Sequence, residues 1–321
     1  MKGRHEITVR NARIQYRFAV ERNITVLRGD SATGKTTMID MIAAYQRSGE
    51  NSGVTLIADK PCVVLSGQNW QLILGTIRDS IVFIDEGDPF VSSKDFARAV
   101  RESDNYYVIA TRIPLPELPY STKEIYGIRN KAGNRYQGTK RLYAEFFPLV
   151  KQTDTPAGKP DLVIVEDSNA GYAFFQHYFG RHGIRCVSAN GKTKIFHALL
   201  SEEYQTALVI ADGAAFGPEI ERVLSLRQVR NMGLYLPESF EWIVLRSDVL
   251  DDPEIRAILS SPENYIASED YFSWEQFFTE LLSTRSRDTY LAYAKRRLNQ
   301  NYLQDSTLNK IVHVFPDGLL E

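Results

Sequence analysis

Short apolar runs rich in β-branched residues recur along the whole chain. In the first half they fall at residues 24–28, 61–65, 80–84 and 106–110. In the second half they fall at 162–165, 184–188 and 207–211, and segments with helical spacing separate them, as at 169–180 and 194–202. Continuous apolar runs are typical of strands buried on both faces, and their alternation with helices is typical of α/β folds. The pattern predicts an α/β protein whose second half holds a small parallel sheet.

Two further strand-rich segments are predicted in the first half. A lead-in with alternating apolar residues spans positions 6–20. A hairpin is expected from strands at 124–129 and 141–147, with its turn near Gly133 and Asn134.

The domain boundaries are predicted from where the periodic pattern stops. Residues 151–160 hold two prolines and one glycine and lack apolar periodicity, which is typical of a linker. We therefore expect a first domain at 1–150, a second at 161–238, and a mostly helical C-terminal extension at 239–321. In that extension the cluster Lys295-Arg296-Arg297 is interpreted as the solvated face of a helix, with contact to a phosphate backbone as the alternative.

Composition narrows the class of protein without deciding its function. The 321 residues are 43% hydrophobic and 24% charged, which is ordinary for a soluble globular chain. The first 150 residues hold 21 basic and 16 acidic residues and the remainder 17 and 24, so neither half has the strongly basic balance of a nucleic-acid-binding domain. Only two cysteines occur, and no apolar run reaches the length of a membrane span. We expect a cytoplasmic protein without membrane association.

One stretch of the first half fits the phosphate-binding pattern G-x-x-x-x-G-K-[ST] at every fixed position. It follows the strand predicted at 24–28 and precedes a helix predicted at 37–45, which is the order that the motif requires. The candidate nucleotide-binding residues are Gly29, Asp30, Ser31, Ala32, Thr33, Gly34, Lys35, Thr36 and Thr37. The stretch predicts a site for ATP with Mg²⁺ as its cofactor.

Each residue type in this stretch has a chemical reason. Gly29 and Gly34 let the backbone curl until successive N–H groups point at phosphate oxygens, and the helix N-terminus adds a favourable dipole. Lys35 would reach the β- and γ-phosphates. Thr36 would supply a hydroxyl to Mg²⁺, and Thr37 would support that turn.

A second element predicts hydrolysis of the bound nucleotide. The apolar strand at 80–84 ends in two acids, Asp85 and Glu86. The segment looks like a Walker B motif, in which Asp85 holds Mg²⁺ and Glu86 polarises the attacking water. The strand at 106–110 ends in Thr111, which is either a polar sensor of the γ-phosphate or an ordinary strand residue.

This first half resembles the ABC and SMC-like branch of P-loop ATPases in its phosphate loop, its strand-rich lead-in and its pair of acids. Only 50 positions separate Lys35 from Asp85, so the long helical subdomain of that branch does not fit and a compact core is implied. Sites of this branch are completed across a subunit interface. The resemblance therefore implies a homodimer or a larger homo-oligomer.

The second half resembles a Toprim domain, the metal-binding module of topoisomerases, primases and overcoming-lysogenization-defect (OLD) nucleases. Glu166 matches the glutamate after the family's first strand, and Asp212 matches the first acid of its D-x-D motif. The resemblance implies that Glu166 is a general acid or base for phosphodiester chemistry and that Asp212 binds Mg²⁺. The chain departs from the pattern at Asp167, where glycine is usual, and at Ala214, which replaces the second aspartate. Asp167 or Glu219 would then complete a single metal site.

The order of the two halves resembles the architecture of OLD nucleases and of the ATPase and Toprim partners in the PARIS type of phage defence. This resemblance implies an ATP-dependent nuclease that acts on DNA or RNA. The alternative is a nucleotide-switched sensor or binding protein, which uses an inactive Toprim-like scaffold to engage a protein partner. The missing second aspartate favours this alternative.

Overall fold

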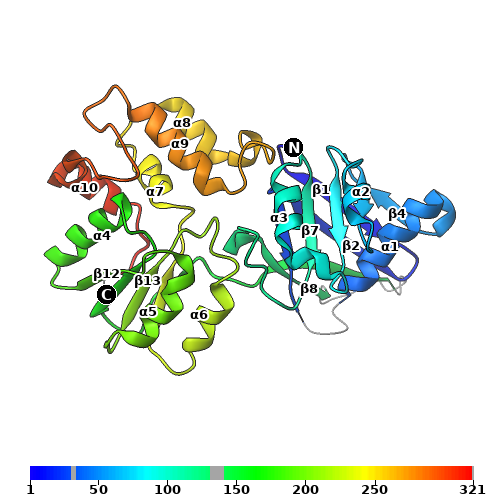
Figure 1. Cartoon of the computed structure of the whole chain (residues 1–321), viewed down its shortest axis with the longest axis horizontal. Helices are drawn as coiled ribbons and strands as arrows, with labels where there is room; N and C mark the ends of the chain where they lie inside the picture. Colours follow the sequence, from blue (N-terminus) through cyan, green and yellow to red (C-terminus); the bar gives the residue numbers. More distant parts are fainter. Residues whose placement is uncertain (30–33, 131–140, 320–321) are drawn as a thin grey trace. The chain divides into compact units, whose positions relative to one another are not determined.

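The computed structural model describes residues 1–29, 34–130 and 141–319, and the chain divides into two compact units (Figure 1). Unit 1 comprises Met1–Val150 and Ser261–Phe272. Unit 2 comprises Lys151–Ser260 and Ser273–Glu321. The predicted α/β class is confirmed, because each unit is built on its own sheet with helices packed on it.

Within the described residues, unit 1 holds a nine-stranded mixed sheet in the order β4-β1-β2-β9-β8-β3-β7-β6-β5 (Figure 1). In chain order its strands are β1 (His5–Arg10), β2 (Ile14–Val20), β3 (Ile24–Leu27), β4 (Thr55–Ile57), β5 (Cys62–Val64), β6 (Ile81–Ile84), β7 (Tyr106–Ala110), β8 (Ile125–Asn130) and β9 (Leu142–Pro148). Strands β3, β7, β6 and β5 are parallel, so their carboxyl ends share one edge. The predicted hairpin is confirmed as the antiparallel pair β8 and β9, and its predicted turn lies outside the described residues.

The core of unit 1 forms between the sheet and its longest helix. The helices are α1 (Lys35–Ser48), α2 (Trp70–Leu74) and α3 (Lys94–Arg101), with short 3₁₀ turns η1 (Gly49–Ser52), η2 (Pro89–Ser92) and η3 (Thr122–Glu124). Met38 and Ile42 of α1 are fully buried in one apolar cluster with Ile7, Val9 and Phe83 of the strands. Burial of this apolar surface holds the start of α1 at the carboxyl edge of the parallel strands.

Residues 261–272 were expected in a C-terminal extension, but they belong to unit 1. Backbone hydrogen bonds attach them to the start of the chain, from Gly3 N to Glu263 O at 2.7 Å and from Ser268 N to Met1 O at 3.0 Å. The side chain of Asn23 also donates to the carbonyl of Phe272 at 2.9 Å. These pairings join residues more than 240 positions apart, which no local pattern in the sequence predicts.

Unit 2 holds, in the described residues, a five-stranded sheet in the order β10-β14-β13-β11-β12. Its strands are β10 (Thr153–Asp154), β11 (Leu162–Val165), β12 (Arg185–Ser188), β13 (Ala207–Ile210) and β14 (Met232–Tyr235). The last four are parallel, which confirms the predicted small parallel sheet. The segment 151–160 is not only a linker, because β10 pairs with β14 and so extends this sheet.

The helices of unit 2 lie in the chain both before and after residues 261–272, the segment that belongs to unit 1. They are α4 (Ala170–Arg181), α5 (Ile195–Ser201), α6 (Ile220–Leu226), α7 (Phe240–Arg246), α8 (Pro253–Ser260), α9 (Trp274–Ser286) and α10 (Asp305–Val312), with 3₁₀ turns η4 (Lys192–Lys194), η5 (Pro262–Asn264, in unit 1) and η6 (Gln300–Leu303). Aromatic residues of α4 are buried in the core, with Phe175 against Phe179, Phe240 and Phe315. In the described part of the chain, none of the helices has the length and apolar character needed to span a bilayer.

Candidate functional site

The first candidate site lies at the start of α1. Gly34 caps this helix in the left-handed conformation, with φ of 92°, and its carbonyl accepts the first helical bond from Met38 N at 3.0 Å. The helix dipole and the N–H groups that point out of a helix N-terminus make such a position favourable for an anion. Gly29 also has a positive φ, of 136°, whereas Asp30, Ser31, Ala32 and Thr33 lie outside the described residues.

Lys35 is buried at this position and its side chain turns back to Gly29. Its Nζ donates to the carbonyl of Gly29 at 2.5 Å, so one side chain links the two ends of the segment 29–35. A buried ammonium needs such acceptors, and phosphate oxygens would be stronger ones. Thr37, by contrast, is exposed in the first turn of α1.

Thr36 and Asp85 meet although they come from different elements. The Thr36 Oγ1 donates to the Asp85 Oδ1 at 3.4 Å, and the Asp85 Oδ1 also accepts from the backbone N of Glu86 at 2.9 Å. A hydroxyl and one carboxylate at the start of a helix are ligands of the kind that Mg²⁺ prefers, since this ion takes oxygen ligands and obtains most of its others from phosphates and water. The structure thus brings together the two residues predicted to hold this ion.

Glu86 forms an ion pair with Arg112 that the sequence analysis did not predict. The Arg112 Nε donates to the Glu86 Oε2 at 3.1 Å, and the Arg112 Nη2 donates to the Glu86 Oε1 at 2.6 Å. The hydrogen bond and charge of Arg112 hold the pKa of Glu86 below its usual range. The hydroxyl of Thr111, the candidate γ-phosphate sensor, bonds to its own loop instead. It donates to the carbonyl of Ile113 at 2.9 Å and accepts from the Ile113 N at 3.1 Å.

Tyr16 is a further residue at this site that no motif contains. It lies on β2, is almost fully buried, and donates from its hydroxyl to the carbonyl of Gly34 at 3.0 Å. A Cβ added at Gly34 would lie 2.8 Å from this hydroxyl. Glycine is therefore required at position 34 both for its φ and for the close approach of Tyr16.

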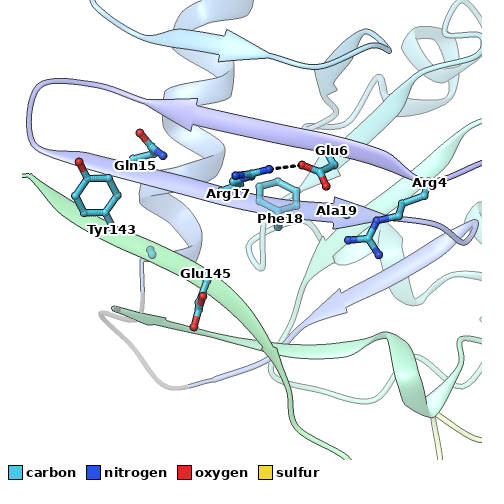
Figure 2. Close-up of a pocket in the computed structure, with 9 residues that line it drawn as sticks. Arg4, Glu6, Gln15, Arg17, Phe18, Ala19, Tyr143 and Glu145 are labelled. Atoms are coloured by element: carbon cyan, nitrogen blue, oxygen red, sulfur yellow. Dashed lines mark hydrogen bonds and ion pairs between the residues drawn. The ribbon is translucent and has the colours of Figure 1, made fainter. Parts of the chain in front are cut away.

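A cavity of about 450 Å³ lies elsewhere in unit 1, over strands β1, β2 and β9 (Figure 2). It is lined by Arg4, Glu6, Gln15, Arg17, Phe18, Ala19, Tyr143, Ala144 and Glu145. Figure 2 shows Arg17 turned toward Glu6, with an Nη2–Oε2 distance of 2.8 Å. Gln15 and Arg17 alternate with Tyr16 along β2, so they point away from the α1 site. We assign no ligand to this cavity.

The second candidate site lies in unit 2, where β11 and β13 end side by side. The Glu166 Oε2 accepts from the backbone N of Asp212 at 3.0 Å, so these two predicted residues are brought together. Burial and then the charge of Glu275 raise the pKa of Glu166 to about 7. Burial and the charges of Glu275 and Glu166 raise the pKa of Asp212 well above its usual range.

Backbone contacts fix the position of Asp212. The next two residues pair with the segment after β14, from Gly213 N to Pro237 O at 2.6 Å and from Ala214 N to Glu238 O at 3.2 Å. A Cβ at Gly213 would lie 2.6 Å from the carbonyl oxygen of Leu236, so only glycine fits there.

Asp167 accepts hydrogen bonds from the turn that leads into α4 and from its first turn. Its Oδ1 accepts from the backbone N atoms of Ser168 at 2.7 Å and Asn169 at 3.0 Å, and its Oδ2 accepts from Gly171 N at 2.7 Å. Both oxygens are thus used by the start of the helix. Glu219, the alternative ligand, is buried with its Oε2 4.0 Å from Arg222.

The C-terminal part of unit 2 holds two polar contacts that the sequence analysis did not predict. The Lys295 Nζ donates to the Glu275 Oε1 at 2.6 Å, and the Tyr293 hydroxyl donates to the Glu241 Oε1 at 2.7 Å. Lys295 lies outside any helix and is only partly exposed. The expectation of a helical face is therefore wrong for this residue, because it lies in a turn and its ammonium contacts Glu275.

These residues do not fit the expected Mg²⁺ site of unit 2. Among the described residues, no three or more His, Cys, Asp or Glu side chains are arranged to hold a metal ion. Asp167 is engaged by α4, Ala214 supplies no ligand, and the ammonium of Lys295 already faces the acids. We derive no chemistry through a metal at this site.

Comparisons with known proteins do not assign this chain to a family. No family model matches it, and no curated protein or solved structure matches it at a significant level. Because folds host many functions, the function has to be argued from the two sites.

Proposed function

We propose that unit 1 binds ATP with Mg²⁺ at the start of α1 and hydrolyses it. The observation that carries this proposal is the meeting of Thr36 and Asp85, whose side chains lie 3.4 Å apart at the start of α1. The phosphate-loop pattern, the buried Lys35 and the acid pair after β6 support the same assignment.

The chemistry of this site follows from what its residues can do. Lys35 exchanges the carbonyl of Gly29 for phosphate oxygens, which are better acceptors for an ammonium. Thr36 and Asp85 hold the Mg²⁺, which when bound neutralises charge on the phosphates. Glu86 orients the attacking water and accepts its proton, and this requires that Arg112 release the carboxylate.

Unit 2 is proposed as a Toprim-like output module whose state follows the nucleotide in unit 1. The covalent path supports such coupling, because residues 261–272 belong to unit 1 and continue directly into α9, which carries Glu275. The poor fit of unit 2 to a metal favours a switched binding module over a nuclease. Its partner would be a second copy of this chain or another protein.

Metal-dependent cleavage of DNA or RNA is the second candidate. It is favoured by the convergence of Glu166 and Asp212 and by the pKa of Glu166 of about 7, which suits a general acid or base. Cleavage of DNA, RNA and tRNA by the full chain, with and without Mg²⁺ or Mn²⁺, tests it directly. Activity that Glu166→Ala abolishes would establish the nuclease, and no cleavage in either protein would exclude it for those substrates.

The ATPase proposal is tested with a fluorescent ATP analogue and a phosphate-release assay. Lys35→Ala should lose binding, whereas Glu86→Gln should bind but turn over slowly. Lys60→Ala is the matched control, since Lys60 pairs with Asp79 at the surface of the same unit. Unchanged binding in Lys35→Ala, or full turnover in Glu86→Gln, would contradict the assignment of that residue.

A further inference from the structure

Arg28 lies at the point where β3 ends and the phosphate-loop segment begins. It is buried, with 5% of its surface exposed, and it directly precedes Gly29. Its backbone N donates to the carbonyl of Tyr126 in β8 at 2.8 Å. The preceding residue, Leu27, accepts from the backbone N of Thr111 at 3.1 Å. The backbone at Arg28 is thus fixed between the strands on either side of β3.

The guanidinium of Arg28 contacts the loop that follows β7. Its Nη1 donates to the carbonyl of Arg112 at 3.5 Å, and its Nη2 donates to the hydroxyl of Tyr120 at 3.2 Å. Tyr120 is itself buried, with 1% of its surface exposed. Because arginine presents its donors in a planar fork, two acceptors define the orientation of the group. These contacts hold the backbone of Arg112 from the side of the phosphate-loop segment.

The same position connects two parts of the candidate ATP site. Gly29, the next residue in the chain, accepts the hydrogen bond from the Lys35 Nζ at 2.5 Å. Arg112, whose carbonyl Arg28 holds, pairs through its own guanidinium with Glu86. Arg28 therefore links the lysine expected to bind phosphate with the arginine that faces the candidate general base. Small displacements of such groups are costly in a catalytic site, because the reacting groups must meet in one geometry.

We propose that Arg28 is a positioning residue of the ATP site, which holds the backbone of Arg112 so that the Arg112 guanidinium meets Glu86. This inference rests on the proposed function of unit 1 and adds to it a residue that no motif contains. Arg22 offers a matched comparison, since it is an arginine with the same exposed fraction of 5%. It lies before β3 rather than after it, and its Nε is 3.5 Å from the Glu124 Oε1.

The first test uses the N–H signals of arginine side chains in ¹H–¹⁵N correlation spectra of the full chain, at pH 7 and without nucleotide. The Arg112 Nε–H signal is assigned from its absence in Arg112→Gln, and Glu86→Ala gives its chemical shift when the pair is broken. In Arg28→Met the signal should move toward the position found in Glu86→Ala. In Arg22→Met, the matched control, it should stay at the wild-type position.

The second test is ATP turnover. Arg28→Met should change turnover in the same direction as Arg112→Gln does. Because Arg28 acts through Arg112, the double variant should turn over ATP at the rate of Arg112→Gln alone. The effects of Arg22→Met and Arg112→Gln should multiply instead, since these residues act independently.

Two results would overturn the proposal. One is an Arg112 signal that stays at the wild-type position in a folded Arg28→Met protein. The other is a pair of effects on turnover, from Arg28→Met and Arg112→Gln, that multiply. If the signal moves as expected but the wild-type chain hydrolyses no ATP, Arg28 still positions Arg112 and it is the proposed function that fails.

A second variant keeps the test decisive if circular dichroism shows Arg28→Met to be unfolded. Arg28→Lys then takes its place, with Arg22→Lys as the control. Lysine keeps the charge but has a single nitrogen at its end, so it does not reproduce the fork that spans both acceptors. The same movement of the Arg112 signal is expected, and its absence counts against the proposal.

Discussion

Arg112 donates hydrogen bonds to both carboxylate oxygens of Glu86, with donor–acceptor distances of 3.1 and 2.6 Å. The two residues follow the neighbouring parallel strands β7 and β6. A two-bond pair of this kind is geometrically specific as well as charge-assisted. Glu86, the residue predicted to activate water, is therefore paired with Arg112. We expect this pair to open when Arg112 binds another anion, such as a phosphate.

The first prediction concerns the pH dependence of ATP turnover. Arg112 lowers the pKa of Glu86, so Arg112→Gln should raise this pKa toward its usual range. Glu86 must be ionised to accept a proton, and the pair with Arg112 is intact in the free enzyme, so the acid limb of the kcat/KM profile, which reports the free enzyme, should move to higher pH in the variant. Arg98→Gln, which removes a surface arginine paired with Asp95, is the control. An acid limb that stays in place would show that Arg112 does not control Glu86.

The second prediction concerns Tyr16 as a positioning residue of the phosphate loop. Tyr16→Phe keeps the ring in the core but removes the hydrogen bond to the Gly34 carbonyl. Binding of a fluorescent ATP analogue should weaken about 2- to 10-fold, as expected for loss of one hydrogen bond. Tyr106→Phe, a buried tyrosine that donates to Gly3 O and Glu21 O instead, should bind as the wild type does. Equal affinity in all three proteins would refute the role of Tyr16.

The third prediction compares two glycines of unit 2. Gly213→Ala would place a Cβ 2.6 Å from the Leu236 carbonyl, so it should destabilise the unit by about 1–3 kcal/mol or more. Gly180 lies in α4 with no atom within 4 Å of an added Cβ. Gly180→Ala should therefore stabilise by up to about 1 kcal/mol. Urea unfolding of both variants measures the difference, and the opposite order of stability is the contrary outcome.

The fourth prediction is the pH dependence of stability in unit 2. The pKa of Glu166 is raised from 4.5 to about 7, so the folded state binds this proton more tightly than the unfolded chain. Its contribution to the free energy of unfolding is present below about pH 4.5 and is lost as the pH rises through about 7.

Glu166→Gln does not titrate and can still accept the hydrogen bond from Asp212 N. The variant should match the wild type in acid and exceed its stability above neutral pH, by on the order of 3 kcal/mol. Chemical denaturation at several pH values tests this, with the surface variant Glu203→Gln as control. Parallel stability curves for Glu166→Gln and the wild type would mean that Glu166 is not a titrating group.

Much of the local structure could be predicted because it depends on neighbours in the chain. The strands 106–110 and 162–165 occur with the predicted bounds, since uninterrupted apolar runs have to be buried on both faces. The positions of Asp85 and Asp212 at strand ends followed from the same pattern, because parallel strands present their carboxyl ends at one edge. The phosphate-loop pattern was likewise visible without the fold, although most of its inner residues lie outside the described part of the chain.

The remaining features depend on contacts between distant segments, which periodicity and motifs do not encode. Arg112 on Glu86, Tyr16 on Gly34 and Lys295 on Glu275 are pairs brought together only by packing of the sheets and helices. The sequence by itself determined the α/β class, most of the strands, and which residues are candidates for phosphate and acid chemistry. Tertiary structure alone decided which cations face those acids, because a charge selects its partner by distance and burial rather than by position in the chain.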